Sequence, residues 1–173
     1  MVDMALLQTI SNLAGALGVL AASAYYIWNI QNNNKQRRNE VVRTIIDRYS
    51  SYELMKVYMS AMEITYDNYD DFHEKYEVKD RETLAKLNTV WAYHDRLGYL
   101  LKEGYVSADT MFDLGGYGSQ YFWEKFEPLD VEWKRRLGEN YMRYVRHLSI
   151  EMMRVKKRRE PSFVVPEQFS KYM

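Results

Sequence analysis

The sequence predicts an all-α protein in which a single N-terminal transmembrane helix continues into a small cytoplasmic helical bundle. Three observations lead to this prediction. The run from Met4 to Asn34 contains no charged side chain, amphipathic helical periodicity follows it, and Gly and Pro number only 8 and 3 among 173 residues. We divide the chain into a transmembrane anchor at 1–34, a helical bundle domain at 35–160 and a C-terminal tail at 161–173.

The N-terminal run is long enough to cross a bilayer. A spanning helix needs about 20 residues at about 1.5 Å each, and the segment 13–30 is apolar apart from Ser23 and Asn29. Aromatic rings, then amides, then cations follow one another at its end, in the order of the environments met on leaving a bilayer. We therefore predict a membrane interface at Tyr25, Tyr26, Trp28, Lys35, Arg37 and Arg38.

Two other interpretations of this segment stay open. Ala22-Ser23-Ala24 fits the cleavage pattern of a signal peptide, although the preceding residues include Asp3 and no Lys or Arg. The polar residues Gln8 and Thr9 are compatible with a buried helix of a soluble protein. For the anchor, the positive-inside rule places the N-terminus outside the cell membrane and the domain in the cytoplasm, as a single-pass protein.

Partners are predicted from small residues and from charge. Ala14, Gly18 and Ala22 recur every four residues and would allow another membrane helix to approach closely, although small residues are common in all membrane helices. We expect the lipid bilayer, other membrane proteins or a second copy as partners. Lys and Arg together equal Asp and Glu together at 24 each, which gives no reason to expect nucleic acid. The absence of Cys excludes disulfides and thiolate chemistry.

The first helices after the anchor follow from the spacing of apolar residues. The membrane helix is predicted to continue as far as Tyr49, because Val41, Val42 and Ile45 form one stripe. Ser50 and Glu53 have the spacing of a capping box that restarts a helix. The segment from Tyr66 to Asp80 has no clean period and is rich in Asp and Asn, so we predict a loop with at most a short helical turn.

The remaining helices are bounded by caps, Gly and Pro. Asp80 would cap a helix over 81–103 that ends at Gly104, and Ser107 would cap a short helix through Leu114. The glycines within 115–118 are then predicted to end this short helix. Pro128 is predicted to separate a brief aromatic helix from a final long helix that begins near Asp130. For the tail after Pro161 we predict no fixed structure.

Two stretches carry a resemblance to a known family. They are LLKEGYVSADTMFDL and YFWEKFEPL, the latter with Trp123 and Pro128 and followed by Arg135 and Arg136. From Ala5 to about Met153 the chain resembles a widespread family of uncharacterised prokaryotic proteins. The resemblance implies one N-terminal membrane helix before a small all-helical domain of unknown function. It implies no activity and no catalytic residue.

Two charged patches are candidate contacts for partners or lipid. The acidic patch is Asp67, Asp70 and Asp71, and the basic patch is Arg154, Lys156, Lys157, Arg158 and Arg159. A solvated loop and a solvated helix end are the ordinary alternatives, since the acidic patch lacks the glycine of an EF-hand and the basic patch lacks a nucleic-acid reading motif. We predict no catalytic residue, metal or cofactor.

We therefore predict a membrane-anchored interaction protein, such as an accessory subunit, scaffold or regulator of a membrane assembly. The alternative is a membrane-surface enzyme or small-ligand sensor with an aromatic pocket at Trp91, His94, Trp123 and Tyr141. Adjacent residues project from different parts of a helix surface, so His94 and Asp95 are not expected to form an orienting pair.

Overall fold

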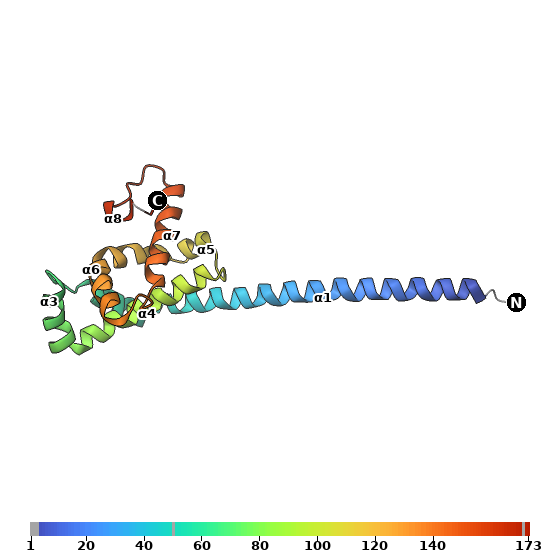
Figure 1. Cartoon of the computed structure of the whole chain (residues 1–173), viewed down its shortest axis with the longest axis horizontal. Coiled ribbons are helices and arrows are strands. Elements are labelled where there is room, and N and C mark those ends of the chain that lie inside the picture. Colours follow the sequence, from blue (N-terminus) through green and yellow to red (C-terminus); the bar gives the residue numbers. More distant parts are fainter. Residues whose placement is uncertain (1–3, 50, 171) are drawn as a thin grey trace. The chain divides into compact units, whose positions relative to one another are not determined.

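The prediction of an all-helical chain is confirmed. The structure is a computed structural model that describes residues 4–49, 51–170 and 172–173, and within these ranges every regular element is a helix (Figure 1). The chain divides into two compact units, Met1–Val41 and Val42–Met173. The second unit contains the bundle.

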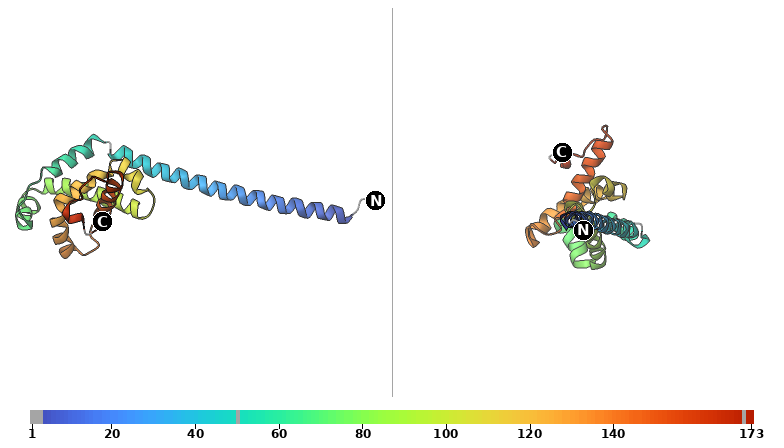
Figure 2. Two further views of the ribbon diagram at one scale, coloured as in Figure 1. Left: turned by 90° about the horizontal axis from the view of Figure 1, so that it is seen from above. Right: turned by 90° about the vertical axis from the view of Figure 1, so that its right-hand side faces the viewer.

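Helix α1 runs without interruption over Met4–Tyr49, which is 46 residues (Figure 2). No residue over 4–40 is buried. Large apolar side chains point to different sides of the helix over 4–30, as Leu17, Val19 and Leu20 illustrate at 64%, 67% and 65% exposure. The predicted restart at Ser50 lies outside the described residues, and the next helix is instead capped by Ser51, whose hydroxyl accepts the Leu54 N–H at 3.3 Å.

The bundle is built on helix α4, Arg81–Lys102, which packs against α2, Tyr52–Met62, and α7, Tyr144–Arg159. Asp80 caps α4 as predicted by accepting the Thr83 N–H at 3.0 Å. Helix α6, Ser119–Leu137, packs against α7 and supplies most of the aromatic core. The short helix α5, Ala108–Asp113, begins at its predicted cap Ser107, and a 3-10 turn η2 follows at Gly116–Gly118.

The acidic segment is helical, so the predicted loop is wrong. Asn68 caps helix α3, Tyr69–Phe72, which continues into the π-helix η1, His73–Lys79. The Asp80 N–H donates to the Lys75 carbonyl at 3.0 Å, the i to i−5 bond that defines the wider helix. The segment has no repeating apolar stripe. It is held in place by Phe72, which is fully buried in the core.

The prediction that Pro128 divides two helices is also wrong, because α6 passes through it. Proline removes one helical hydrogen bond and bends the helix. At this bend the Tyr66 hydroxyl donates to the Lys125 carbonyl at 2.5 Å, and the Lys125 ammonium donates to the Met62 carbonyl at the end of α2. The helix ends instead at Gly138, whose φ of +100° suits glycine, and the last long helix begins at Tyr144.

The tail has fixed structure, contrary to the prediction. Residues Glu167–Ser170 form the short helix α8, and Phe169 is only 1% exposed within the main core cluster. Phe163, Val165 and Tyr172 also pack against this cluster. The prediction relied on the two prolines, whereas burial of aromatic side chains decides the outcome.

Helices α4 and α7 touch backbone to backbone at Gly98. A Cβ atom at this position would lie 2.0 Å from the Tyr144 carbonyl oxygen and 2.7 Å from its carbon. We predict that Gly98→Ala forces the helices apart and destabilises the domain by about 3 kcal/mol or more. Denaturant unfolding of the detergent-solubilised protein measures this change. Thr89→Ala on the exposed face of α4 is the control and should stay within about 0.5 kcal/mol; equal stability of the two variants would contradict the contact.

Candidate functional site

The basic patch at the end of α7 is paired within the domain. Arg158 contacts the Asp109 carboxylate at 2.6 Å, and Arg159 contacts Asp109 at 3.0 Å and also Asp113. Hydrogen bonds from the two guanidinium groups lower the pKa of Asp109, and that from Arg159 lowers the pKa of Asp113. These pairs join α5 to α7, a role that the sequence analysis did not predict.

The other cations of the patch contact the tail. Lys157 Nζ donates to the carbonyls of Pro161 and Phe163, each at 2.7 Å. Lys156 lies 4.3 Å from the centroid of the Phe163 ring, and Arg154 donates to the Tyr172 carbonyl at 2.7 Å. Every predicted cation of the patch therefore has a partner inside the domain.

The acidic patch lies on helix α3 and just before it, far from α7 along the sequence. Asp71 accepts from Lys75 at 2.7 Å and from the backbone N–H of Asp67 at 3.1 Å, while Asp70 is exposed. Among the described residues no ion pair joins the acidic patch to the basic patch. The structure does not bring the two predicted patches together.

A polar cluster that the sequence analysis missed is centred on Glu77. Its carboxylate accepts hydrogen bonds from Trp133 Nε1 at 2.8 Å, from the Tyr69 hydroxyl at 3.0 Å and from His73 Nδ1 at 2.6 Å. Burial would raise the pKa of Glu77, but the hydrogen bonds from Trp133, His73 and Tyr69 outweigh it, so the pKa lies below the ordinary value of 4.5. The His73 to Glu77 spacing of four residues was the only signal in the sequence.

Neighbouring charges extend this cluster along α6. The Arg136 guanidinium lies 4.3 Å from the centroid of the Tyr69 ring, and Glu132 pairs with Arg135 and Arg136. The pKa of Glu132 is lowered to about 2 by these two arginines. Burial, together with the Glu77 carboxylate, raises the pKa of Tyr69 to about 12. The cluster ties α3 and η1 to α6, and the Tyr69 hydroxyl stays protonated as a donor.

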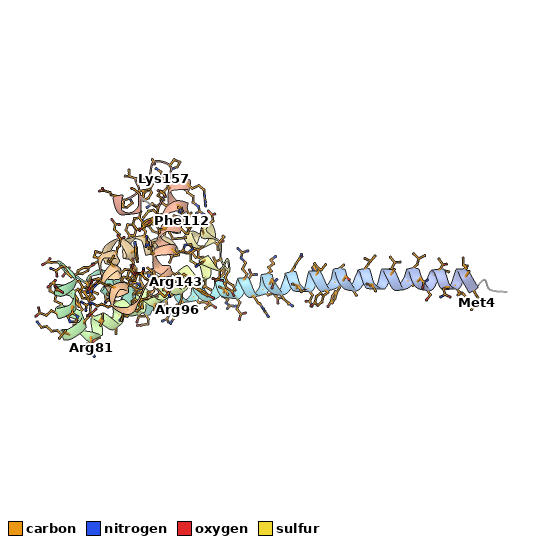
Figure 3. The ribbon with its side chains drawn as sticks, viewed as in Figure 1. Met4, Arg81, Arg96, Phe112, Arg143 and Lys157 are labelled. Atoms are coloured by element: carbon orange, nitrogen blue, oxygen red, sulfur yellow. The ribbon has the colours of Figure 1, made fainter. Side chains whose placement is uncertain are left out.

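The four residues of the predicted aromatic pocket do not converge on one cavity. Trp91 and Trp123 are buried in the core with ring centroids 6.3 Å apart. Tyr141 packs against Trp133 and lines a surface depression with Arg96. Figure 3 labels Arg96, which lies on α4.

His94 is a buried, neutral histidine. Its Nδ1–H donates to the Val90 carbonyl at 3.0 Å, and its ring stacks on Phe122 at 4.9 Å. Burial lowers its pKa to about 4. A cavity of about 20 Å³ beside it has room for about one water molecule and is lined by Leu54, Met55, Tyr58, Val90 and Tyr93. The described residues contain no cluster of three His, Cys, Asp or Glu side chains that could hold a metal ion.

The predicted membrane residues all lie on α1. The small residues Ala14, Gly18 and Ala22 are exposed, and a Cβ atom at Gly18 would meet nothing within 4 Å. The aromatic and cationic residues at the predicted interface are exposed as well, and the rings of Tyr25 and Trp28 lie 6.2 Å apart. Along α1 the aromatic side chains come first and the cations follow, as in the sequence.

Comparison with known proteins places the chain in a family. Residues 12–152 match the family described as a domain of unknown function, DUF4760. The chain belongs to this family. The match begins within α1 and ends within α7, so the tail and the last turns of α7 lie beyond the DUF4760 region. No curated protein and no solved structure matches the chain. An uncharacterised family is therefore confirmed, and its distribution among prokaryotes stays a prediction.

We predict that Glu77 contributes a pH-dependent part of the stability. Because its folded pKa is below 4.5, the contribution is fully present above that value and is lost as the pH falls through the folded pKa. Glu77→Gln should therefore cost about 1–3 kcal/mol at pH 7, and its difference from the unchanged protein should shrink in acid. Unfolding of both proteins across this pH range measures the effect.

Glu74→Gln provides the matched control, because Glu74 makes an exposed pair with Lys79 on the same π-helix. We expect it to leave the stability almost unchanged at every pH, because solvent screens an exposed ion pair. An effect of Glu77→Gln that stays constant down to acid pH would show that the charge of Glu77 does not stabilise the fold.

Proposed function

We propose that this DUF4760 protein is a single-pass protein of the cell membrane, with its N-terminus outside and residues 35–160 in the cytoplasm. The observation that carries the proposal is the N-terminal part of α1, which is apolar, long enough to cross a bilayer and without a buried residue over 4–40. Exposing that many large apolar side chains to water costs on the order of 10 kcal/mol or more. Such a cost rivals the stability of a whole domain, so the helix needs an apolar environment.

The residues that follow the apolar stretch support the same orientation. Tyr25, Tyr26 and Trp28 would lie at the headgroup level, and Lys35, Arg37 and Arg38 would face the cytoplasmic leaflet, in keeping with the positive-inside rule. The bilayer is then the first partner of the chain.

We further propose that the domain acts as an accessory subunit, scaffold or regulator of a membrane assembly. Its core is filled by packed aromatic rings, and the pairs of Arg158 and Arg159 with α5, together with the hydrogen bond from Trp133 to Glu77, join one helix to another. Catalysis needs titratable groups that converge on a cavity, whereas association with another protein needs a rigid surface. The stripe of Ala14, Gly18 and Ala22 would add a contact within the membrane.

The anchor is tested by placing a charge in its centre. Leu17→Arg should cost about 2.5–3.5 kcal/mol of insertion free energy and release much of the protein into the alkaline carbonate supernatant of isolated membranes. Asn33→Arg, outside the apolar stretch, is the control and should stay in the membrane pellet. If the unchanged chain itself is extracted by carbonate, the anchor is refuted.

The orientation is tested with single cysteines, since the chain has none of its own. Val2→Cys should react with a membrane-impermeant maleimide on intact cells. Ser162→Cys should react only after the cells are permeabilised, because it would lie in the cytoplasm. The reverse labelling pattern would keep the anchor but overturn the orientation.

A further inference from the structure

The tail lies along one face of α7. Figures 1 and 2 both show the last residues, in red, returning beside this helix. Arg146, Arg154 and Lys157 recur on α7 at helical spacing and all contact the tail. We call this surface, with the apolar site that receives Phe169, the α7 groove.

Two aromatic side chains anchor the tail in the groove. Phe169 is 1% exposed and belongs to the main core cluster together with Trp133, Val145 and Met153. Three residues later, the Tyr172 ring lies 4.5 Å from the Arg146 guanidinium, which also donates to its hydroxyl. The other contacts are made to the backbone of the tail, since Lys157 and Arg154 donate hydrogen bonds to its carbonyls. The groove therefore reads a Phe-x-x-Tyr segment.

The tail is joined to the end of α7 by a short connection. Glu160 leaves the helical conformation with φ −125° and ψ 81°, Pro161 follows, and one turn hydrogen bond links the Phe163 N–H to the Glu160 carbonyl at 2.9 Å. Opening this turn would free the tail without breaking a helical hydrogen bond of α6 or α7. The tail also lies beyond the family match at 12–152.

We propose that the α7 groove is a docking site for the Phe169 to Tyr172 segment of a second copy of this chain, which exchanges with the segment bound in the same chain. The second copy is the occupant because its segment is identical to the one that the groove already holds. Exchange of an identical element is a low-cost route to dimers. A tethered segment competes at an effective concentration on the order of millimolar, so exchange is favoured where copies are crowded. This inference does not depend on the membrane anchor.

The test uses two full-length chains with different tags, one carrying Glu151→Cys on α7 and the other Met173→Cys beside Tyr172, so that Arg146, Phe169 and Tyr172 are all kept. The chain has no cysteine of its own, so a short bis-maleimide added after co-expression joins only the introduced positions, and the two tags distinguish the mixed dimer from dimers of one variant. We expect a covalent dimer that carries both tags. Adding Phe169→Ala to the Met173→Cys chain should reduce this dimer at least tenfold, whereas Phe169→Leu, which keeps an apolar anchor, should retain it.

The double variant Glu151→Cys/Met173→Cys in one chain reports the tail bound in cis, by peptide mapping of the internal cross-link. Internal cross-linking without a mixed dimer would overturn the exchange and leave the tail as a fixed part of the fold. A mixed dimer that is unchanged by Phe169→Ala would show random collision and would also overturn it. If neither product forms, the tail does not occupy the groove and the inference fails.

Discussion

The domain depends on the contacts of Trp91. This fully buried side chain of α4 lies 5.3 Å from Phe122 and 4.9 Å from Trp133, measured between ring centroids. The two partners stand 11 positions apart on α6, which would be about 16 Å along a straight helix. One indole reaches both because α6 curves, as Figure 1 shows, and the proline at 128 lies between them. The residue that looked like a helix boundary thus allows one helix to wrap around the core.

The same core sets the position of the polar cluster. Trp133 uses its ring to contact Trp91 and its Nε1–H to reach Glu77, so the π-helix is fixed to α6 by a buried donor. The Nε1–H of Trp91 itself has no hydrogen-bond partner. An unpaired buried donor costs about 1–3 kcal/mol, which several aromatic contacts at about 0.5–1.5 kcal/mol each can offset. Packing therefore dominates at Trp91, whereas packing and hydrogen bonding act together at Trp133.

The sequence predicted those parts of the fold that depend on local rules. The caps Asp80 and Ser107 and the long apolar helix follow from side-chain chemistry within a few residues. The errors arose where distant residues decide. Helix α3 forms because Phe72 is buried by other elements, and the tail is ordered because Phe169 enters a site built by the core. Neither burial partner can be recognised from the neighbouring sequence.

The candidate sites show the same limit for charge. A run of cations such as Lys156, Lys157 and Arg158 looks like an external binding patch, because a sequence does not show which carboxylates or carbonyls fold back onto it. Single exposed ion pairs contribute about 0–1 kcal/mol, so the arginine pairs with α5 matter mainly by occupying the cations. Cations that are already paired bind phosphate groups less strongly, so recognition of a partner at this surface depends on its shape. The α7 groove is a surface of that kind, since it selects two aromatic side chains by burial and accepts the backbone by hydrogen bonds. If the chain is anchored by α1, confinement to the membrane plane would raise the local concentration of copies, which is the quantity that decides between a tail bound in the same chain and a tail bound in its neighbour.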